Sequence, residues 1–85
     1  MKNSITKEEI QELLDNSERM TFTVFEKCTI TALKLPNGFI LVESSACVDP
    51  SNYNESLGEK LNLERVEKKL WELEGYSLQK ELNKL

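Results

Sequence analysis

The sequence has 85 residues and a formal charge of −4, and its 15 acidic and 11 basic residues are spread over the whole chain. Without a basic segment there is little counterion release to drive nucleic-acid binding, so a nucleic-acid partner is not expected. Apolar residues make up 39% of the chain and charged residues 31%, as in ordinary folded domains. We therefore expect one domain over residues 1–85, small enough that a partner subunit would add substantially to its stability.

The cysteine and histidine content narrows the possible chemistry further. The chain has two cysteines and no histidine, so neither a zinc site nor a Cys–His nucleophile is expected. No apolar run approaches the roughly 20 residues that span a bilayer, and no secretory leader precedes the first helix. We expect a cytoplasmic protein without a cofactor, in which Cys28 and Cys47 remain thiols.

The first predicted element is a short helix over residues 7–15. Thr6 is a favourable N-cap residue, and Glu9 three positions later completes a capping box. Ile10 begins a narrow apolar stripe at helical spacing. A helix this short must pack on another element.

Residues 21–35 are rich in Thr, Val, Ile and Phe, which favours strands. The apolar alternation is interrupted at Phe25-Glu26-Lys27, which indicates either a tight turn between two strands or a bulge in one bent strand, and we favour the turn. Pro36-Asn37-Gly38 predicts a second turn. Four consecutive apolar residues follow, Phe39 to Val42, and predict an inner strand covered on both faces.

Asp49-Pro50 is typical of a helix start, with an N-cap followed by proline at the first helical position. Helical character extends from there to about Leu82, with a break near Gly58 possible. One apolar stripe of this helix comprises Leu63, Val66, Leu70 and Leu73. A second, on roughly the opposite side, comprises Leu57, Leu61, Trp71 and Leu78. A helix that is apolar on two sides needs two partners, so we expect the second stripe to be an interface with another subunit or protein.

Together these elements predict an α+β fold: a short N-terminal helix, a small two- or three-stranded antiparallel meander, and a long C-terminal helix packed on the sheet. The small core and the two-sided helix lead us to expect a homo-oligomer.

Two long segments resemble the signatures of a short phage protein family, the 49/66 family. The first is Leu35-Pro-Asn-Gly-Phe-Ile-Leu-Val42 followed by Ser44-Ser-Ala-Cys-Val-Asp-Pro50, and the second is Lys69-Leu-Trp-Glu-Leu-Glu-Gly-Tyr76. The resemblance covers nearly the whole chain, and it departs from the family pattern around residues 26–34. It implies a phage or prophage accessory protein in the host cytoplasm, and it brings no activity that can be transferred residue by residue.

The most suggestive candidate site is the junction between the strand after Gly38 and the following helix. Small hydroxyl residues there run into a helix N-terminus, where free N–H groups attract anions. Ser44, Ser45 and Asn52 would be donors, and Tyr53 a stacking surface for a nucleotide. The structural alternative, in which these residues only complete the connection, is the commoner outcome for short motifs.

No constellation of side chains predicts catalysis, so we expect a binding protein. The leading hypothesis is a counter-defence protein that sequesters a nucleotide-like host molecule. The alternatives are a module that binds a host or phage protein through the Trp71 face, and a minor structural component of the phage.

Overall fold

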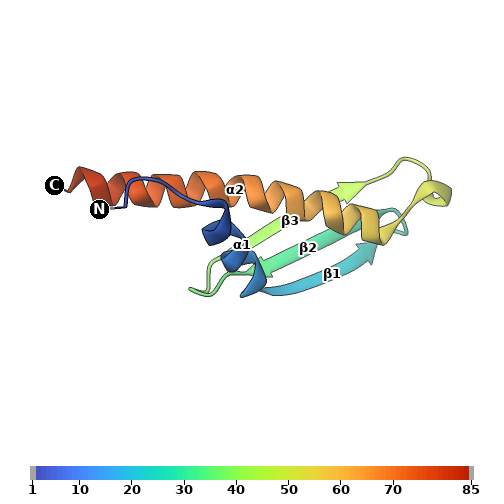
Figure 1. The fold of residues 1–85 in the computed structure, drawn as a ribbon. Helices are drawn as coiled ribbons and strands as arrows, with labels where there is room; N and C mark the ends of the chain where they lie inside the picture. The colour runs from blue at the N-terminus through green and yellow to red at the C-terminus, as the bar shows by residue number, and fades with distance from the viewer. Residues whose placement is uncertain (1, 85) are drawn as a thin grey trace.

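The computed structural model describes residues 2–84, and it confirms the α+β fold. A three-stranded antiparallel sheet is covered on one side by a long helix, and a short helix packs beside that helix (Figure 1). The molecule is elongated, with extents of 55 × 20 × 19 Å, because the long helix continues past the sheet. In chain order the elements are α1 (Lys7–Asp15), β1 (Glu18–Val24), β2 (Cys28–Lys34), β3 (Ile40–Ala46), the 3-10 turn η1 (Pro50–Asn52) and α2 (Glu55–Asn83).

The sheet is a meander in the order β1-β2-β3, so β2 is its central strand. The connection between β1 and β2 is the tight turn that the sequence favoured over a bulge. Both Phe25 and Glu26 have positive φ (53° and 61°), and the N–H of Lys27 donates to the carbonyl of Val24. This is the backbone of a type I′ turn built without the usual Asn-Gly. Gly38, at φ 93°, closes the second hairpin as predicted.

The prediction of an inner strand over Phe39 to Val42 was wrong. The strand begins at Ile40 and is an edge strand, paired with β2 alone. Only Leu41 of this run is buried, because its side chain faces α2 while Ile40 and Val42 face away from it. The strand also continues through Ala46, so the two serines placed at its exit lie within it.

The helix start predicted at Asp49-Pro50 was also too early. Asp49 does cap, since its side chain accepts a hydrogen bond from the N–H of Ser51, but it begins only the single turn η1. The chain then becomes extended at Tyr53, and α2 starts afresh with Asn54 as its N-cap. The break therefore falls at residues 53 and 54, and the helix passes through Gly58 without interruption.

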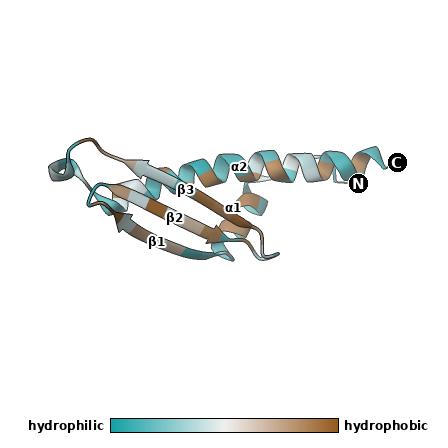
Figure 2. Ribbon diagram, turned by 180° about the vertical axis from the view of Figure 1, so that it is seen from behind, coloured by the Kyte–Doolittle hydropathy of each residue, from teal (hydrophilic) through white to brown (hydrophobic). Residues whose placement is uncertain are grey.

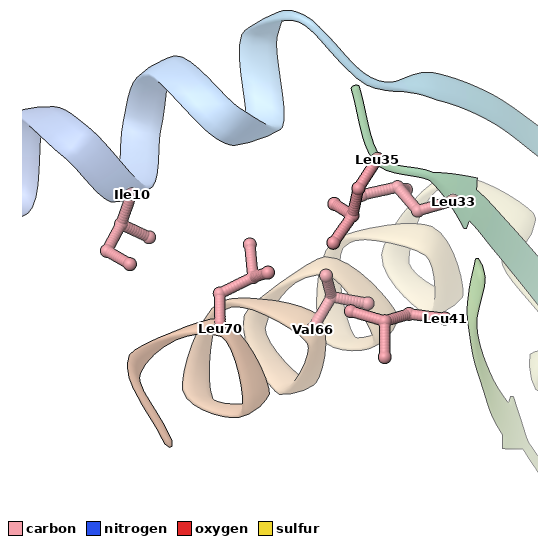
Figure 3. Packing of buried hydrophobic residues seen from close by; sticks show 6 residues of the cluster. All are labelled: Ile10, Leu33, Leu35, Leu41, Val66 and Leu70. Carbon is pink, nitrogen blue, oxygen red and sulfur yellow. The ribbon is translucent and has the colours of Figure 1, made fainter. Parts of the chain in front are cut away.

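The apolar core lies where α1 and α2 meet the end of the sheet that carries the β2–β3 turn. Thr6 caps α1 by accepting from the N–H of Glu9, as the capping box predicts. Figure 3 shows side chains from four elements and from the residue after β2 converging on one cluster. Its buried members are Ile10, Leu33, Leu35, Leu41, Val66 and Leu70.

Towards the other end of the sheet, the contact between α2 and β2 is polar. Thr29, Thr31 and Asn62 are fully buried there. The Asn62 amide donates to the carbonyl of Thr29 (3.1 Å) and to the hydroxyl of Thr31 (3.0 Å). Gly58 brings the helix backbone against β2, because a Cβ at this position would lie 2.2 Å from the Oγ1 of Thr29. Close approach and a buried amide thus hold this half of the helix on the sheet.

Candidate functional site

A cavity of about 140 Å³ opens where the end of β3, the turn η1 and the first turns of α2 meet, and we call it the junction pocket. Its floor is formed by β2 and β3 and its walls by η1 and α2. These elements come together at the end of the molecule far from the two chain termini (Figure 1). The lining residues are Thr29, Ser45, Ala46, Cys47, Asn52, Tyr53, Asn54, Leu57, Gly58 and Leu61.

Tyr53 is fixed in this pocket by hydrogen bonds to the sheet. Its hydroxyl lies 2.6 Å from the Oγ1 of Thr29 on β2 and 2.7 Å from the Oγ1 of Thr23 on β1. Thr23 in turn donates to the carboxylate of Glu55 at the start of α2. The extended backbone at Tyr53, which ends η1, places the ring so that these bonds form. The phenol is therefore a structural anchor of the pocket wall.

Three of the four residues predicted to bind a ligand are brought together here. Ser45, Asn52 and Tyr53 all line the junction pocket. The hydroxyl of Ser45 donates to the carbonyl of Gly58 across the floor (3.0 Å). Ser44 is separated from them, because successive strand residues point to opposite faces and its side chain lies on the face away from α2.

The residues predicted to form an interface divide into two groups along α2. Leu57 and Leu61 line the junction pocket, and Leu57 is 54% exposed. Trp71 lies ten residues beyond Leu61, about 15 Å along the helix, and Leu78 lies further out still. The predicted ligand and interface sets thus share one cavity, and half of the interface set is remote from it.

The chemistry of the junction pocket suits an apolar side chain better than an anion. None of its lining residues is a lysine or arginine. The carboxylates of Asp49 and Glu55 are near it, and so is one cationic residue, Lys27, whose backbone carbonyl accepts from the N–H of Cys47. The hydrogen bond from the backbone N–H of Ser51 holds the pKa of the Asp49 carboxyl below its ordinary value of 3.8, so this group is anionic at neutral pH. Two carboxylates beside an uncharged pocket disfavour a phosphate.

Two exposed apolar residues beside this pocket were missed at the sequence level. Phe25, at the tip of the β1–β2 turn, is 88% exposed, and Val48 is 93% exposed. The turn is held against the segment after β3, because the N–H of Cys47 donates to the carbonyl of Lys27 (3.0 Å). Phenylalanine at positive φ is uncommon, which could have marked this position if the turn type had been assigned.

Two larger cavities, each about 430 Å³, lie near α1. One is bounded by the end of α1, the start of β1 and α2. Its only cation among the lining residues, Arg19, is 3.9 Å from the carboxylate of Glu59. The other is lined by three glutamates, which makes it unsuitable for an anion. Among residues 2–84 no cluster of histidine, cysteine and carboxylate side chains is arranged to hold a metal ion.

The face of the sheet that points away from α2, here called the outer sheet face, is apolar and open to solvent. Figure 2 turns this face towards the viewer. Cross-strand pairing aligns its side chains in rows, such as Met20, Ala32 and Val42. Its apolar members are Met20, Phe22, Val24, Cys28, Ile30, Ala32, Ile40, Val42 and Ala46. In a sheet covered on one side, the covered face is usually the apolar one. At the Thr29 end of this sheet the arrangement is the opposite, because the covered face carries threonines and contacts a buried amide.

Comparison with known proteins gives a single result. Residues 5–82 match the model of the phage protein (N4 Gp49/phage Sf6 gene 66) family. The chain belongs to this family. Searches among curated proteins and among solved structures found no match. The match agrees with the resemblance noted in the two sequence signatures, and it makes this a phage protein. The family match does not name a specific role, so the role is inferred below from the exposed surfaces of the structure. Within residues 2–84, no helix has both the length and the apolar composition of a membrane span.

Proposed function

We propose that this phage protein is a non-catalytic accessory protein that acts in the host cytoplasm by binding another protein at the junction pocket. The observation that carries the proposal is the combination of a cavity of about 140 Å³ with exposed apolar residues at the same end of the sheet. Leu57 lines the cavity, Val48 follows the lining residue Cys47, and Phe25 is in the turn that is bonded to Cys47 through Lys27. A cavity of this size is below the 300–1,000 Å³ of most small-molecule sites, and it suits one inserted side chain. Apolar anchors in small pockets are typical centres of protein interfaces.

Backbone strain at Phe25 supports the same conclusion. A bulky residue in the left-handed region costs about 1 kcal/mol or more. The side chain of Phe25 is almost wholly exposed, so it gains little from packing within the chain that would explain a phenylalanine at this position. Strained and exposed apolar residues gather at recognition sites, where they serve a contact with a partner.

Sequestration of a nucleotide-like host molecule, the counter-defence hypothesis, is the second candidate. It is favoured by the hydroxyl groups of Thr29, Ser45 and Tyr53, which line the pocket. Those hydroxyls already bond to each other or to the carbonyl of Gly58, and no cation lines the cavity. The protein partner is therefore the better supported of the two.

The test is co-purification of the tagged full-length chain from phage-infected cells, with two variants as comparison. Leu57→Asp places a charge at the rim of the pocket. Tyr76→Asp is the control: it introduces the same charge away from the pocket, on the distal part of α2, at a residue that is 68% exposed. We expect a partner in stoichiometric amount with the wild type and with Tyr76→Asp, and its loss with Leu57→Asp.

Retention of the partner by Leu57→Asp, or its loss with Tyr76→Asp alone, would contradict the assignment of the pocket. Isothermal titration of the purified chain with a panel of cyclic and ADP-ribose nucleotides addresses the second candidate. If a nucleotide gives a saturable heat of binding that Leu57→Asp abolishes, and no protein co-purifies, the ligand of the pocket is a nucleotide and not a protein.

A further inference from the structure

We propose that the outer sheet face is the contact between two copies of this chain, which pack sheet against sheet as a symmetric dimer. The proposal concerns a surface on the opposite side of the sheet from α2. It is separate from the partner proposed for the junction pocket, because Ala46 is the one residue that belongs to both surfaces.

The outer sheet face is a large exposed apolar patch of the kind that marks an interaction surface. Its four exposed large apolar side chains, Met20, Phe22, Ile40 and Val42, are each between 45% and 68% exposed. With ordinary side-chain areas these four alone expose roughly 400 Å² of mainly apolar surface, which is within the roughly 300–600 Å² of the largest patch on a typical monomer, and such patches are often functional. The half-buried apolar residues between them, such as Ile30 and Ala32, make the patch continuous.

The area fits a second copy of the chain. Adding the half-buried residues and the polar rim brings each protomer to roughly 600–800 Å², which approaches the share that one partner buries in a standard interface. Two such sheets would pack about 10 Å apart with their apolar side chains interdigitating, as in a β-sandwich. Small Ala32, in a row between Met20 and Val42, leaves room for a larger side chain from the other copy.

Charge also permits this occupant. The whole chain carries −4, which makes two copies repel at long range. The outer sheet face carries only two charges, Glu18 and Lys34, which are direct cross-strand partners at one end of the sheet. Opposite charges side by side give this face no net charge, so two copies can meet on it without bringing like charges together over the apolar rows.

The small core leaves the monomer with little buried apolar area, which a dimer would increase. Only six apolar residues are buried among residues 2–84, and the covered side of the sheet uses part of its area for the polar contact with Asn62. A chain of this size gains the missing apolar burial most directly from a second copy.

The proposal is tested by the mass of the full chain in solution, measured by light scattering after size-exclusion chromatography at about 50 µM. We expect a dimer for the wild type. Val42→Lys should reduce the mass to that of a monomer by placing a charge beside Ala32, within an apolar row of the outer sheet face. Leu57→Lys, matched in exposure but on the α2 side, should remain a dimer. Circular dichroism shows whether each variant is folded.

A monomeric wild type would overturn the proposal, and so would a folded Val42→Lys protein that remains a dimer. If Val42→Lys does not fold, a cross-link decides. With Cys28→Ser and Cys47→Ser as background, Ala32→Cys lies on the central strand, where two sheets about 10 Å apart bring both thiols within reach of a short bismaleimide. Covalent dimer from Ala32→Cys, and none from Glu8→Cys on α1, supports the sheet contact. Failure of Ala32→Cys to cross-link overturns it.

Discussion

Two glycines of α2 give the same substitution opposite consequences, which makes them a sensitive test of how the helix lies on the sheet. A Cβ at Gly75 would meet no heavy atom within 4 Å. Gly75→Ala should therefore gain only the helix propensity of alanine, about 1 kcal/mol. For a domain of this size that raises the Tm by roughly 4–8 °C.

Gly58→Ala should destabilise the protein in spite of the same gain in propensity. The new Cβ would lie 2.2 Å from the Oγ1 of Thr29, 2.7 Å from its Cβ and 3.1 Å from the hydroxyl of Ser45. The Cβ of Thr29 is fixed directly to the backbone of β2 and cannot rotate out of the way, so the helix has to move away from β2. Overpacking of about 1–3 kcal/mol, with the loss of the bond from Ser45 to the Gly58 carbonyl at about 1 kcal/mol, exceeds the gain in propensity. The net loss is about 1–3 kcal/mol.

The assay is urea unfolding followed by circular dichroism at one fixed protein concentration, because self-association would make stability depend on concentration. We expect the midpoint to fall for Gly58→Ala and to rise for Gly75→Ala, with similar m-values. If Gly58→Ala were as stable as the wild type, the close approach of α2 to β2 would be refuted, and with it the shape of the junction pocket floor.

Three further substitutions probe the turn, the buried amide and the acid response. Glu26→Gly places glycine at one of the two positions of positive φ in the β1–β2 turn, and it should stabilise the protein by about 0.5–1.5 kcal/mol in the same urea assay. A loss of stability would contradict the turn type. Asn62→Ala leaves two buried groups of β2 without their donor and should cost about 1–3 kcal/mol, whereas a neutral result would mean that the amide is not buried. The lowered pKa of Asp49 means that the folded state favours the carboxylate, so its stabilising contribution is present above about pH 4 and is lost as the pH falls through the lowered value. Asp49→Asn should therefore flatten part of the decline in stability between about pH 5 and pH 2, and an unchanged acid profile would show that the bond from Ser51 does not form.

Features that depend on near neighbours in the chain were predictable. The capping of α1 requires only Thr6 and Glu9, which are three residues apart, and the turn at Gly38 requires only the residues that flank it. Such local rules predicted both α-helices and the second turn, and they favoured a first turn over a bulge at residues 25–27. They also located three residues of the junction pocket, because a strand exit and a helix entry adjacent in sequence are adjacent in space.

Features decided by distant contacts were not predictable in the same way. Asp49-Pro50 is a good local helix start, but the bonds of the Tyr53 hydroxyl to Thr23 and Thr29 hold the chain in an extended form and postpone the helix to Asn54. Four apolar residues in a row suggest burial on both sides, and nothing local shows that the strand lies at an edge.

The covered face of the sheet could not be chosen from the alternation alone. One set of side chains in β2 is Thr29, Thr31 and Leu33, and the other is Cys28, Ile30 and Ala32. The second set is the more apolar, so the hydrophobic pattern favours burying it. The helix lies on the first set, where Gly58 and Asn62 match the threonines in shape and hydrogen bonding.

The buried Asn62 has a further consequence for the geometry of the whole molecule. Apolar contacts allow a helix to slide on a sheet with little change in energy, whereas an amide must meet its acceptors within a few tenths of an ångström. A slip of α2 by one turn, 5.4 Å, would bring Gly58 or Val66 to the place of Asn62, and neither side chain can donate to the carbonyl of Thr29. Asn62 thus fixes the position of α2 along the strands, and with it the position of Leu57 and Leu61 in the wall of the junction pocket.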